Sequence, residues 1–394
     1  MSYASLTSII DVRGHSIQSF LEVKDRKRQE NRVNITRRQF IQKSGLSLLG
    51  AVVVMNTGSM AFANSSATPF KPIRFAVISD LHIDIKGKNA FRMSAYSVDC
   101  LHRTIEDLNK EKDLSFVVAN GDLLMDGEVE NAKVLRDAMK NLTAKSFVVC
   151  GNHDYQPADP KKRREGFTYL DIDDFVNYFA DYGYGKSGQR YYANQIVPGL
   201  RMLVLDACLP GEKRWGGRLP DEQLSWLDTE LSSHSDQVNL VFMHHNFLPW
   251  TVDEFKGGPK QQFCIDNDAD VRAILEKNSH ATPVAISGHR HIGLHARELN
   301  KVNYFAVPSL NSHPMRYSVF TISPEQISWK TPMVSVGEAK HLEAREALLN
   351  ATWWRDEQYS QRSSGNDTAV LGLYENNNMI IGARSLKKEL LQNS

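Results

Sequence analysis

Five short apolar segments of the chain are each followed, within two residues, by Asp, Asn or His, and this pattern constrains the fold more than any other feature. Apolar runs of this length, bounded by polar residues, are typical of buried strands. The motifs that follow the segments are, in chain order, Ser79-Asp80-Leu81-His82, Asn120-Gly121-Asp122, Gly151-Asn152-His153-Asp154, His244-His245 and Gly288-His289-Arg290-His291.

Amphipathic stretches separate the first three segments. Apolar residues from Val98 to Leu108 recur at spacings of 3, 4 and 3, which predicts one face of a helix, and residues 129–142 carry a second such stripe. Strands at residues 75–78, 116–119 and 147–150 therefore alternate with helices. This alternation predicts βαβ units, a largely parallel central sheet and an α/β fold.

The second half of the chain repeats this order and then changes. Its predicted elements are strands at 201–206, 240–243 and 284–287 and helices at 220–231 and 268–278. Beyond Val302, short apolar runs at 304–307, 317–322 and 326–329 predict antiparallel strands that complete a second sheet. Residues 339–350 predict a helix and residues 363–366 a loop, and the stretch from about Ser335 otherwise follows no clear pattern.

The polar residues after the strands have the chemistry of metal ligands. Carboxyl ends of parallel strands share one edge of a sheet, where α/β folds bind ligands. Carboxylate, amide and imidazole groups without a thiolate suit zinc, iron or manganese. Asp80 with His82, and His289 with His291, would each point the same way in extended chain. The two oxygens of Asp122 could bridge two ions about 3.5–4 Å apart, the spacing of two-metal phosphoryl-transfer sites.

Each motif alone is weak. A single Asp-x-His or Gly-Asp is usually polar surface, whereas Gly-Asn-His-Asp and Gly-His-x-His directly after a strand are much rarer. The presence of all five in this order, each at the end of a strand, argues strongly against chance.

The set D-x-H, G-D, G-N-H-[DE], H and G-H-x-H resembles that of the calcineurin-like metallophosphoesterases, over about residues 74–323. The resemblance implies a four-layer α/β/β/α sandwich of two mixed sheets flanked by helices. It also implies two divalent or mixed-valence metal ions (Fe, Mn or Zn), which share Asp122 as a ligand. His244 matches the family's fourth motif better than His245, although the expected proline comes later, at Pro249. The implied metal ligands are Asp80, His82, Asp122, Asn152, His244, His289 and His291.

The resemblance implies a phosphoesterase in which a water or hydroxide that bridges the metals attacks phosphorus in line with the leaving group. His153 is the candidate proton donor or phosphate clamp. Asp154 either orients the His153 ring, which would make it the second catalytic residue, or forms a cap or loop hydrogen bond, and the sequence favours neither role.

The segments at 205–211, 217–219 and 223–227 resemble the branch that contains class III cyclic-nucleotide phosphodiesterases and bacterial glycerophosphodiesterases. A small-molecule phosphodiester is therefore the expected substrate. The alternatives are a periplasmic phosphomonoesterase or phosphoprotein phosphatase and, less favoured, a non-catalytic metal-binding module. The candidate pocket walls are Arg290, Asn246, Trp250, His313 and Arg316, and the basic run Lys161-Lys162-Arg163-Arg164 is expected to be solvated surface.

The N-terminal region resembles a twin-arginine export signal. Arg37 and Arg38 precede an apolar stretch from Gly45 to Met55, and small residues that end at Ala63 fit a cleavage site. The apolar stretch is too short for a membrane span, which needs roughly 20 residues. We therefore expect the export machinery as a partner, no stable membrane anchor, and a periplasmic or otherwise exported bacterial protein.

These patterns divide the chain into an N-terminal extension with its signal (1–63), a metallophosphoesterase domain (70–334) and a C-terminal extension of unknown role (335–394).

The formal net charge of +1 provides no overall electrostatic field that would attract nucleic acid, and nucleic acid is not expected as a partner. The four cysteines form no C-x-x-C pair, and Cys150 and Cys208 lie in or beside apolar runs typical of buried free thiols.

Overall fold

The computed structural model describes residues 68–211, 213–251, 254, 256–258, 261–281, 283–351, 372–375 and 381–385. All of them belong to one compact unit that spans residues 64–394. The export signal and the loop predicted at residues 363–366 lie outside the described residues. Among the helices that the structure describes, none has the length and apolarity that crossing a membrane would require.

The first sheet has six strands in the order β14-β13-β12-β1-β2-β3. β1, β2 and β3 are parallel, whereas β12, β13 and β14 add to the far edge of β1 in antiparallel pairs. The strands are β1 (Ile73–Ile78), β2 (Leu114–Asn120), β3 (Lys145–Val149), β12 (Ser318–Ile322), β13 (Gln326–Lys330) and β14 (Ile381–Ser385).

The second sheet also has six strands, in the order β10-β11-β9-β8-β5-β4. Its four central strands are parallel, and β10 and β4 close the two edges in antiparallel pairs. The strands are β4 (Tyr192–Val197), β5 (Leu200–Val204), β8 (Val238–Phe242), β9 (Pro283–Ser287), β10 (His295–Leu299) and β11 (Val302–Ala306); β6 (Cys208–Leu209) and β7 (Lys213–Gly217) form a separate hairpin.

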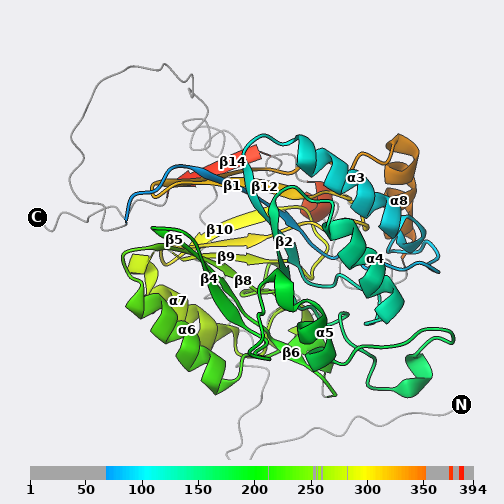
Figure 1. Ribbon diagram of the computed structural model, residues 1–394, viewed down its shortest axis with the longest axis horizontal. Helices are drawn as coiled ribbons and strands as arrows, with labels where there is room; N and C mark the ends of the chain where they lie inside the picture. The colour runs from blue at the N-terminus through cyan, green and yellow to red at the C-terminus, as the bar shows by residue number, and fades with distance from the viewer. Residues whose placement is uncertain are drawn as a thin grey trace, which may run out of the picture. The chain divides into compact units, whose positions relative to one another are not determined.

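Helices cover the outer faces of the two sheets (Figure 1). The α-helices are α3 (Ser97–Lys110), α4 (Val129–Met139), α5 (Ile172–Tyr178), α6 (Asp221–Ser233), α7 (Asp268–Lys277) and α8 (Glu338–Asn350). Short 3-10 helices are η1 (Ser94–Tyr96), η2 (Pro160–Lys162), η3 (Ala180–Tyr182), η5 (Gln261–Phe263) and η6 (Ser279–Ala281).

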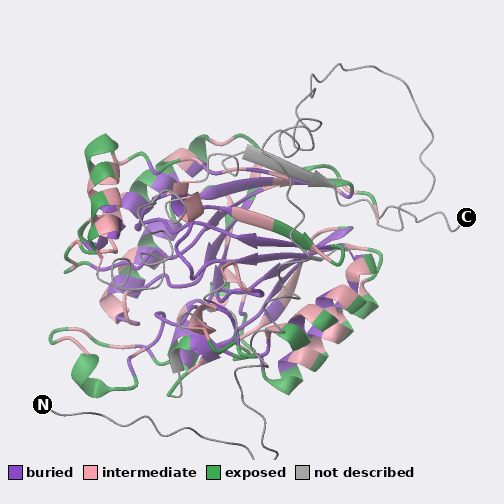
Figure 2. Cartoon of the chain, turned by 180° about the vertical axis from the view of Figure 1, so that it is seen from behind, coloured by how far each residue is buried: buried purple, intermediate pink, exposed green. Residues whose placement is uncertain are grey.

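Side-chain alternation along the strands builds the layers. In β5, Met202 and Val204 pack in the cluster between the sheets, whereas Leu203 packs with Leu227 of α6 and Val271 of α7. Both faces of the second sheet are therefore buried, and Figure 2 shows its central strands buried throughout. The predicted α/β class and the implied sandwich of two mixed sheets flanked by helices are confirmed.

The predicted antiparallel completion of the second sheet was wrong. The strand predicted at 304–307 does join that sheet, as β11, but it runs parallel to β9 and antiparallel only to β10. The strands at 317–322 and 326–329 do not complete the second sheet: as β12 and β13 they extend the first, and β12 pairs with β1. Without β12, β1 would be an edge strand, although Phe75 and Ala76 within it are fully buried. Before the chain reaches β12 it passes β1 at Ser309, which forms a parallel β-bridge with Ser79, the residue that follows β1.

The C-terminal extension contributes to the domain. α8 occupies the stretch predicted to be helical, and β14 adds an edge strand that no sequence pattern indicated. Between them, Tyr374 is buried against Ile292 and Leu348. Leu373 O accepts a hydrogen bond of 2.8 Å from Gly293 N, two residues after His291. The described part of the extension therefore packs behind the Gly-His-x-His loop.

Candidate metal centre

The predicted ligands gather from both sheets. Four of them follow β1, β2 and β3 of the first sheet and three follow β8 and β9 of the second, and all seven are buried. Six of the seven form two groups whose ligand atoms lie within 4.8 Å of one another. The first group is Asp80, His82, Asp122 and His291, and the second is Asp122, His244 and His289.

Asp122 is common to both groups because its two oxygens face different histidines. Its Oδ1 lies 3.3 Å from Nε2 of His244, and its Oδ2 lies 3.6 Å from Nε2 of His82. Asp80 also contacts a histidine of the first group, because its Oδ1 lies 3.1 Å from Nε2 of His291. One carboxylate between two sets of donors is the arrangement that can bridge a pair of cations.

Three of the four ligand imidazole rings are oriented as metal ligands usually are, whereas Nδ1 of His82 has no hydrogen-bond partner. A ligating histidine presents one nitrogen to the metal while its other nitrogen is held by a protein acceptor. His244 Nδ1 lies 3.0 Å from Asn120 O, His291 Nδ1 lies 2.9 Å from Ser312 Oγ, and His289 Nε2 lies 3.1 Å from Trp215 O. In each ring the other nitrogen faces the cluster.

Asn152 and His245 occupy different settings. The Asn152 amide is fully buried, and neither its oxygen nor its nitrogen has a hydrogen-bond partner. Such a group is costly unless something else completes it, and a metal ion bound to the oxygen would do so. Both neighbours of Asn152 contact Asp122: His153 N donates to Asp122 Oδ1 at 2.8 Å, and Gly151 packs directly against it. His245 lies beside the cluster, with its ring centre 4.6 Å from that of His289, and belongs to neither group.

The backbone at the cluster is left-handed at most ligands. Asp80, His82, Asp122, His289 and His291 all have φ between 41° and 66°, a region that L-residues seldom adopt outside glycine. The expectation that each D-x-H or H-x-H pair converges through extended chain was therefore wrong. Both residues of each pair have positive φ, and residues in this region tend to cluster at functional sites.

Glycine allows the two sheets to meet at the cluster. Gly121 has φ +81°, and a Cβ built on it would lie 2.5 Å from Cγ of His244. On the other side, a Cβ on Gly288 would lie 2.1 Å from Oγ of Ser79. Both distances are shorter than any real carbon contact, so the histidine loops of the second sheet can approach the first only where side chains are absent.

The electrostatics of the cluster keep its carboxylates ionised. Burial by itself would raise the pKa of Asp122, but the imidazoles of His244 and His153 outweigh burial and hold that pKa well below its ordinary value. Burial would lower the pKa of His244, yet Asp122 and Asp80 raise it to about 9. The pKa of His289 is lowered to about 3 by burial and by His244. Ionised carboxylates and neutral imidazoles are the forms that bind cations, so His244 would release its proton when a cation binds.

Asp126, and not the adjacent aspartate, holds the ring of His153. His153 Nδ1 lies 2.6 Å from Met125 O and 3.0 Å from Asp126 Oδ1, both of which accept hydrogen bonds only. Asp154 instead accepts from the backbone N–H groups of Leu123, Leu124 and Gly151, at 2.7 to 2.8 Å. Asp154 therefore forms loop hydrogen bonds and does not orient the His153 ring, because its oxygens point at backbone donors.

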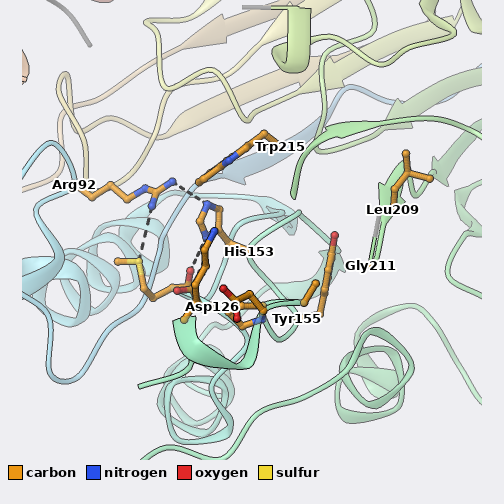
Figure 3. Close-up of a pocket in the computed structure, with 12 residues that line it drawn as sticks. Arg92, Asp126, His153, Tyr155, Leu209, Gly211 and Trp215 are labelled. Atoms are coloured by element: carbon orange, nitrogen blue, oxygen red, sulfur yellow. Dashed lines mark hydrogen bonds and ion pairs between the residues drawn. The ribbon is translucent and has the colours of Figure 1, made fainter. Parts of the chain in front are cut away.

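Two adjoining cavities open from the cluster. The inner cavity, of about 210 Å³, is lined by Asp122, His289 and His291 of the cluster, and the outer cavity, of about 400 Å³, is lined by His153. Arg92 and Trp215 line both cavities and so mark their boundary. Figure 3 shows the Arg92 guanidinium directed toward the His153 ring, with its Nη2 3.0 Å from His153 Nε2.

Most of the predicted wall residues lie elsewhere. Arg290 lines the inner cavity and forms a buried ion pair of 2.6 Å with Glu254. The other four candidates (Asn246, Trp250, His313 and Arg316) are not among the residues that line these two cavities.

The basic run at 161–164 is only partly solvated surface. Arg164 pairs with Asp84 and Glu128, at 2.9 and 2.6 Å, and Lys162 lines the outer cavity. All four cysteines are buried free thiols, which was predicted for Cys150 and Cys208, and none belongs to the two donor groups.

The fold and the cluster thus define an α/β protein with a buried Asp/His cluster that is suited to a dinuclear metal site. The family model of the calcineurin-like phosphoesterases matches residues 73–293, more than half of the chain. The chain belongs to this family.

Relatives and a solved structure agree with this assignment. A probable glycerophosphodiester phosphodiesterase of Arcobacter nitrofigilis is 28% identical over 43% of this chain and 55% of that protein, so the chain spans about half the length of that relative. A probable cyclic nucleotide phosphodiesterase of Synechococcus is 28% identical over 53% of this chain and 73% of that protein. The crystal structure of a dimetal phosphatase from Danio rerio matches with TM-score 0.51 and 16% identity, over 67% of this chain and 96% of that one, and shows the shared fold.

Proposed function

We propose that this protein hydrolyses small phosphodiesters at a pair of divalent cations held by the seven buried ligands. The observation that carries the proposal is the sharing of Asp122 between two groups of donors from the two sheets, with the ligand atoms of each group within 4.8 Å of one another. The preference for diesters is supported by the names of the two relatives described above, each of which is named as a probable phosphodiesterase. When bound, the cations would activate a water molecule and offset charge on the phosphoryl oxygens.

The residues at the cavity boundary are suited to hold the phosphate. Arg92 is a permanent cation with several donors, and it lines the cavity that contains the cluster. Because Met125 O and Asp126 accept from Nδ1 of His153, the hydrogen of the neutral ring resides there, and Nε2 accepts from Arg92. An anionic phosphoryl group beside Arg92 would favour a second proton on His153. That proton, on Nε2, could pass to the leaving oxygen.

A panel of p-nitrophenyl phosphate, bis-p-nitrophenyl phosphate and a cyclic nucleotide tests this proposal. We expect the manganese-loaded protein to turn over the diesters with higher kcat/KM than the monoester, and Asp122→Asn to abolish turnover of all three. A monoester preference would favour the phosphatase alternative. A lack of turnover on every substrate, in protein that binds metal, would favour the non-catalytic alternative.

The metals are proposed to be iron, manganese or zinc, because the donors are imidazole, carboxylate and amide groups and include no thiolate. Reconstitution of chelated protein with each ion, followed by metal analysis and by the same panel, would rank them. Magnesium that restored full activity while all three transition metals failed would contradict this choice, since imidazole is a poor ligand for magnesium.

We also propose that the protein is exported to the periplasm through the twin-arginine route. Arg37 and Arg38 before the apolar stretch support this proposal, as does the small-residue site that ends at Ala63. In a bacterial host, the full chain should appear in the periplasmic fraction, and Arg37→Lys with Arg38→Lys should retain it in the cytoplasm. Arg26→Lys with Arg28→Lys is the matched control. Export that survived the first pair of changes would contradict the route.

A further inference from the structure

The outer cavity has a largely apolar lining although it adjoins a polar centre. Of its charged residues, Arg92 and Asp126 both contact His153 at the boundary, and Lys162 and Asp159 come from the η2 region. Because two of these side chains are positive and two are negative, the lining of the cavity has no net charge. The remaining lining is Met125, Tyr155, Pro157, Ala158, Leu209, Gly211, Trp215 and the ring of His153.

Trp215 stands out in this lining. Its exposed fraction is 48%. Among the described residues, four large hydrophobic side chains are exposed (Ile85, Trp215, Met333 and Leu342), and of these only Trp215 lines either cavity. An exposed tryptophan at the mouth of a cavity is typical of a ligand contact, because the ring loses water contact only when something covers it. Figure 3 shows this ring beside His153, and the two ring centres lie 4.9 Å apart.

The position of Trp215 is tied to the metal centre. Its carbonyl oxygen lies 3.1 Å from Nε2 of His289, whose other nitrogen faces the cluster. A residue fixed by a metal ligand keeps a constant distance from the reacting atoms. A group attached to a phosphate at the cluster would therefore meet the same ring at every binding event.

We propose that the outer cavity binds an aromatic ring carried by one ester group of the substrate, and that this ring stacks on Trp215. The inference rests on the proposed function and narrows its substrates to phosphoesters with an aromatic substituent. A volume of about 400 Å³ lies within the range of ligand pockets and exceeds what a methyl or glyceryl group would fill. Flat rings gain from offset or edge contacts with indole beyond the area that they bury.

Phenylphosphonate and methylphosphonate are suitable probes because the phosphorus–carbon bond is not hydrolysed. Calorimetric titration of the manganese-loaded full chain should show phenylphosphonate binding at least about fivefold more tightly. Trp215→Ala should reduce this ratio below about twofold and leave methylphosphonate affinity unchanged, whereas Trp215→Phe should retain the ratio. Trp226→Ala, on α6 and packed against Tyr191 outside both cavities, is the matched control and should behave as the unchanged protein.

Three results would overturn the inference: equal affinity for the two phosphonates in the unchanged protein, a ratio that survives Trp215→Ala, or binding of neither phosphonate to metal-loaded protein. Because binding is measured without turnover, these results are separate from a failure of the proposed hydrolysis. If the protein distinguishes the two phosphonates through Trp215 but hydrolyses no diester, the inference about the outer cavity is supported and the proposed reaction is contradicted.

Discussion

Replacement of Gly121 by alanine is predicted to weaken both the fold and the metal centre. Gly121 precedes Asp122, has φ +81°, and would bring its Cβ to 2.5 Å from the His244 ring. The left-handed backbone alone costs an alanine roughly 1–2 kcal/mol. The forced contact adds about 1–3 kcal/mol, because the ring or the backbone must shift. The free energy of unfolding should therefore fall by about 2–5 kcal/mol.

Gly185 provides a matched control for this experiment. It also has positive φ (+67°), but a Cβ on it would meet nothing within 4 Å. Gly185→Ala should therefore cost only the backbone part, about 1–2 kcal/mol, and should leave metal affinity unchanged. Gly121→Ala should also reduce metal affinity by about 10–100-fold, the range typical of a displaced support for a ligand.

Two measurements check these values. Urea unfolding of chelated protein gives the stability differences without any contribution from bound metal. Calorimetric titration with manganese gives the affinities. Equal stability and equal metal affinity in the two variants would refute the conclusion that Gly121 is required for the approach of His244 to Asp122.

Four further outcomes are expected. His153→Ala should keep both metals in elemental analysis and lower turnover by at least about tenfold; unchanged turnover would remove His153 from the mechanism. Asp154→Ala leaves three buried backbone donors without their acceptor, so urea unfolding should show a loss of at least about 3 kcal/mol, and a loss below about 1 kcal/mol would contradict this role. The four thiols should react with a disulfide reagent only after denaturation, because all are buried; rapid labelling of the native protein would contradict their burial. Chelation should lower the melting temperature of the protein, since metal binds only the folded state; equal melting temperatures for chelated protein and for protein with saturating manganese would contradict binding at the cluster.

Local patterns predicted the strands and the ligands well. Apolar runs such as residues 75–78 and 284–287 are fixed by their own composition, and each is a strand in the structure. The metal ligands follow these strands directly, so their approximate place was predictable once parallel pairing was inferred. The choice between His244 and His245 needed the structure, because both follow β8 and only the pairing with Gly121 and Asp122 separates them.

Features that depend on distant pairing could not be predicted. Nothing within β12 or β13 indicates which sheet they join, because the choice depends on the free edge of β1. The positive φ angles at the ligands could not be predicted from residue type, because residues other than glycine seldom adopt this region. Arg92 and Trp215 belong to no motif, and the tertiary fold alone brings them to the boundary of the two cavities.

The most direct test of the metal centre is elemental analysis of the purified full chain beside its Asp122→Ala variant. Two groups of donors that share one carboxylate should hold two transition-metal ions per chain, and loss of the shared carboxylate should remove at least one of them. A chain that carries no more than one ion after saturation with manganese, iron or zinc would contradict the dinuclear site. So would an Asp122→Ala variant that keeps two ions with unchanged affinity.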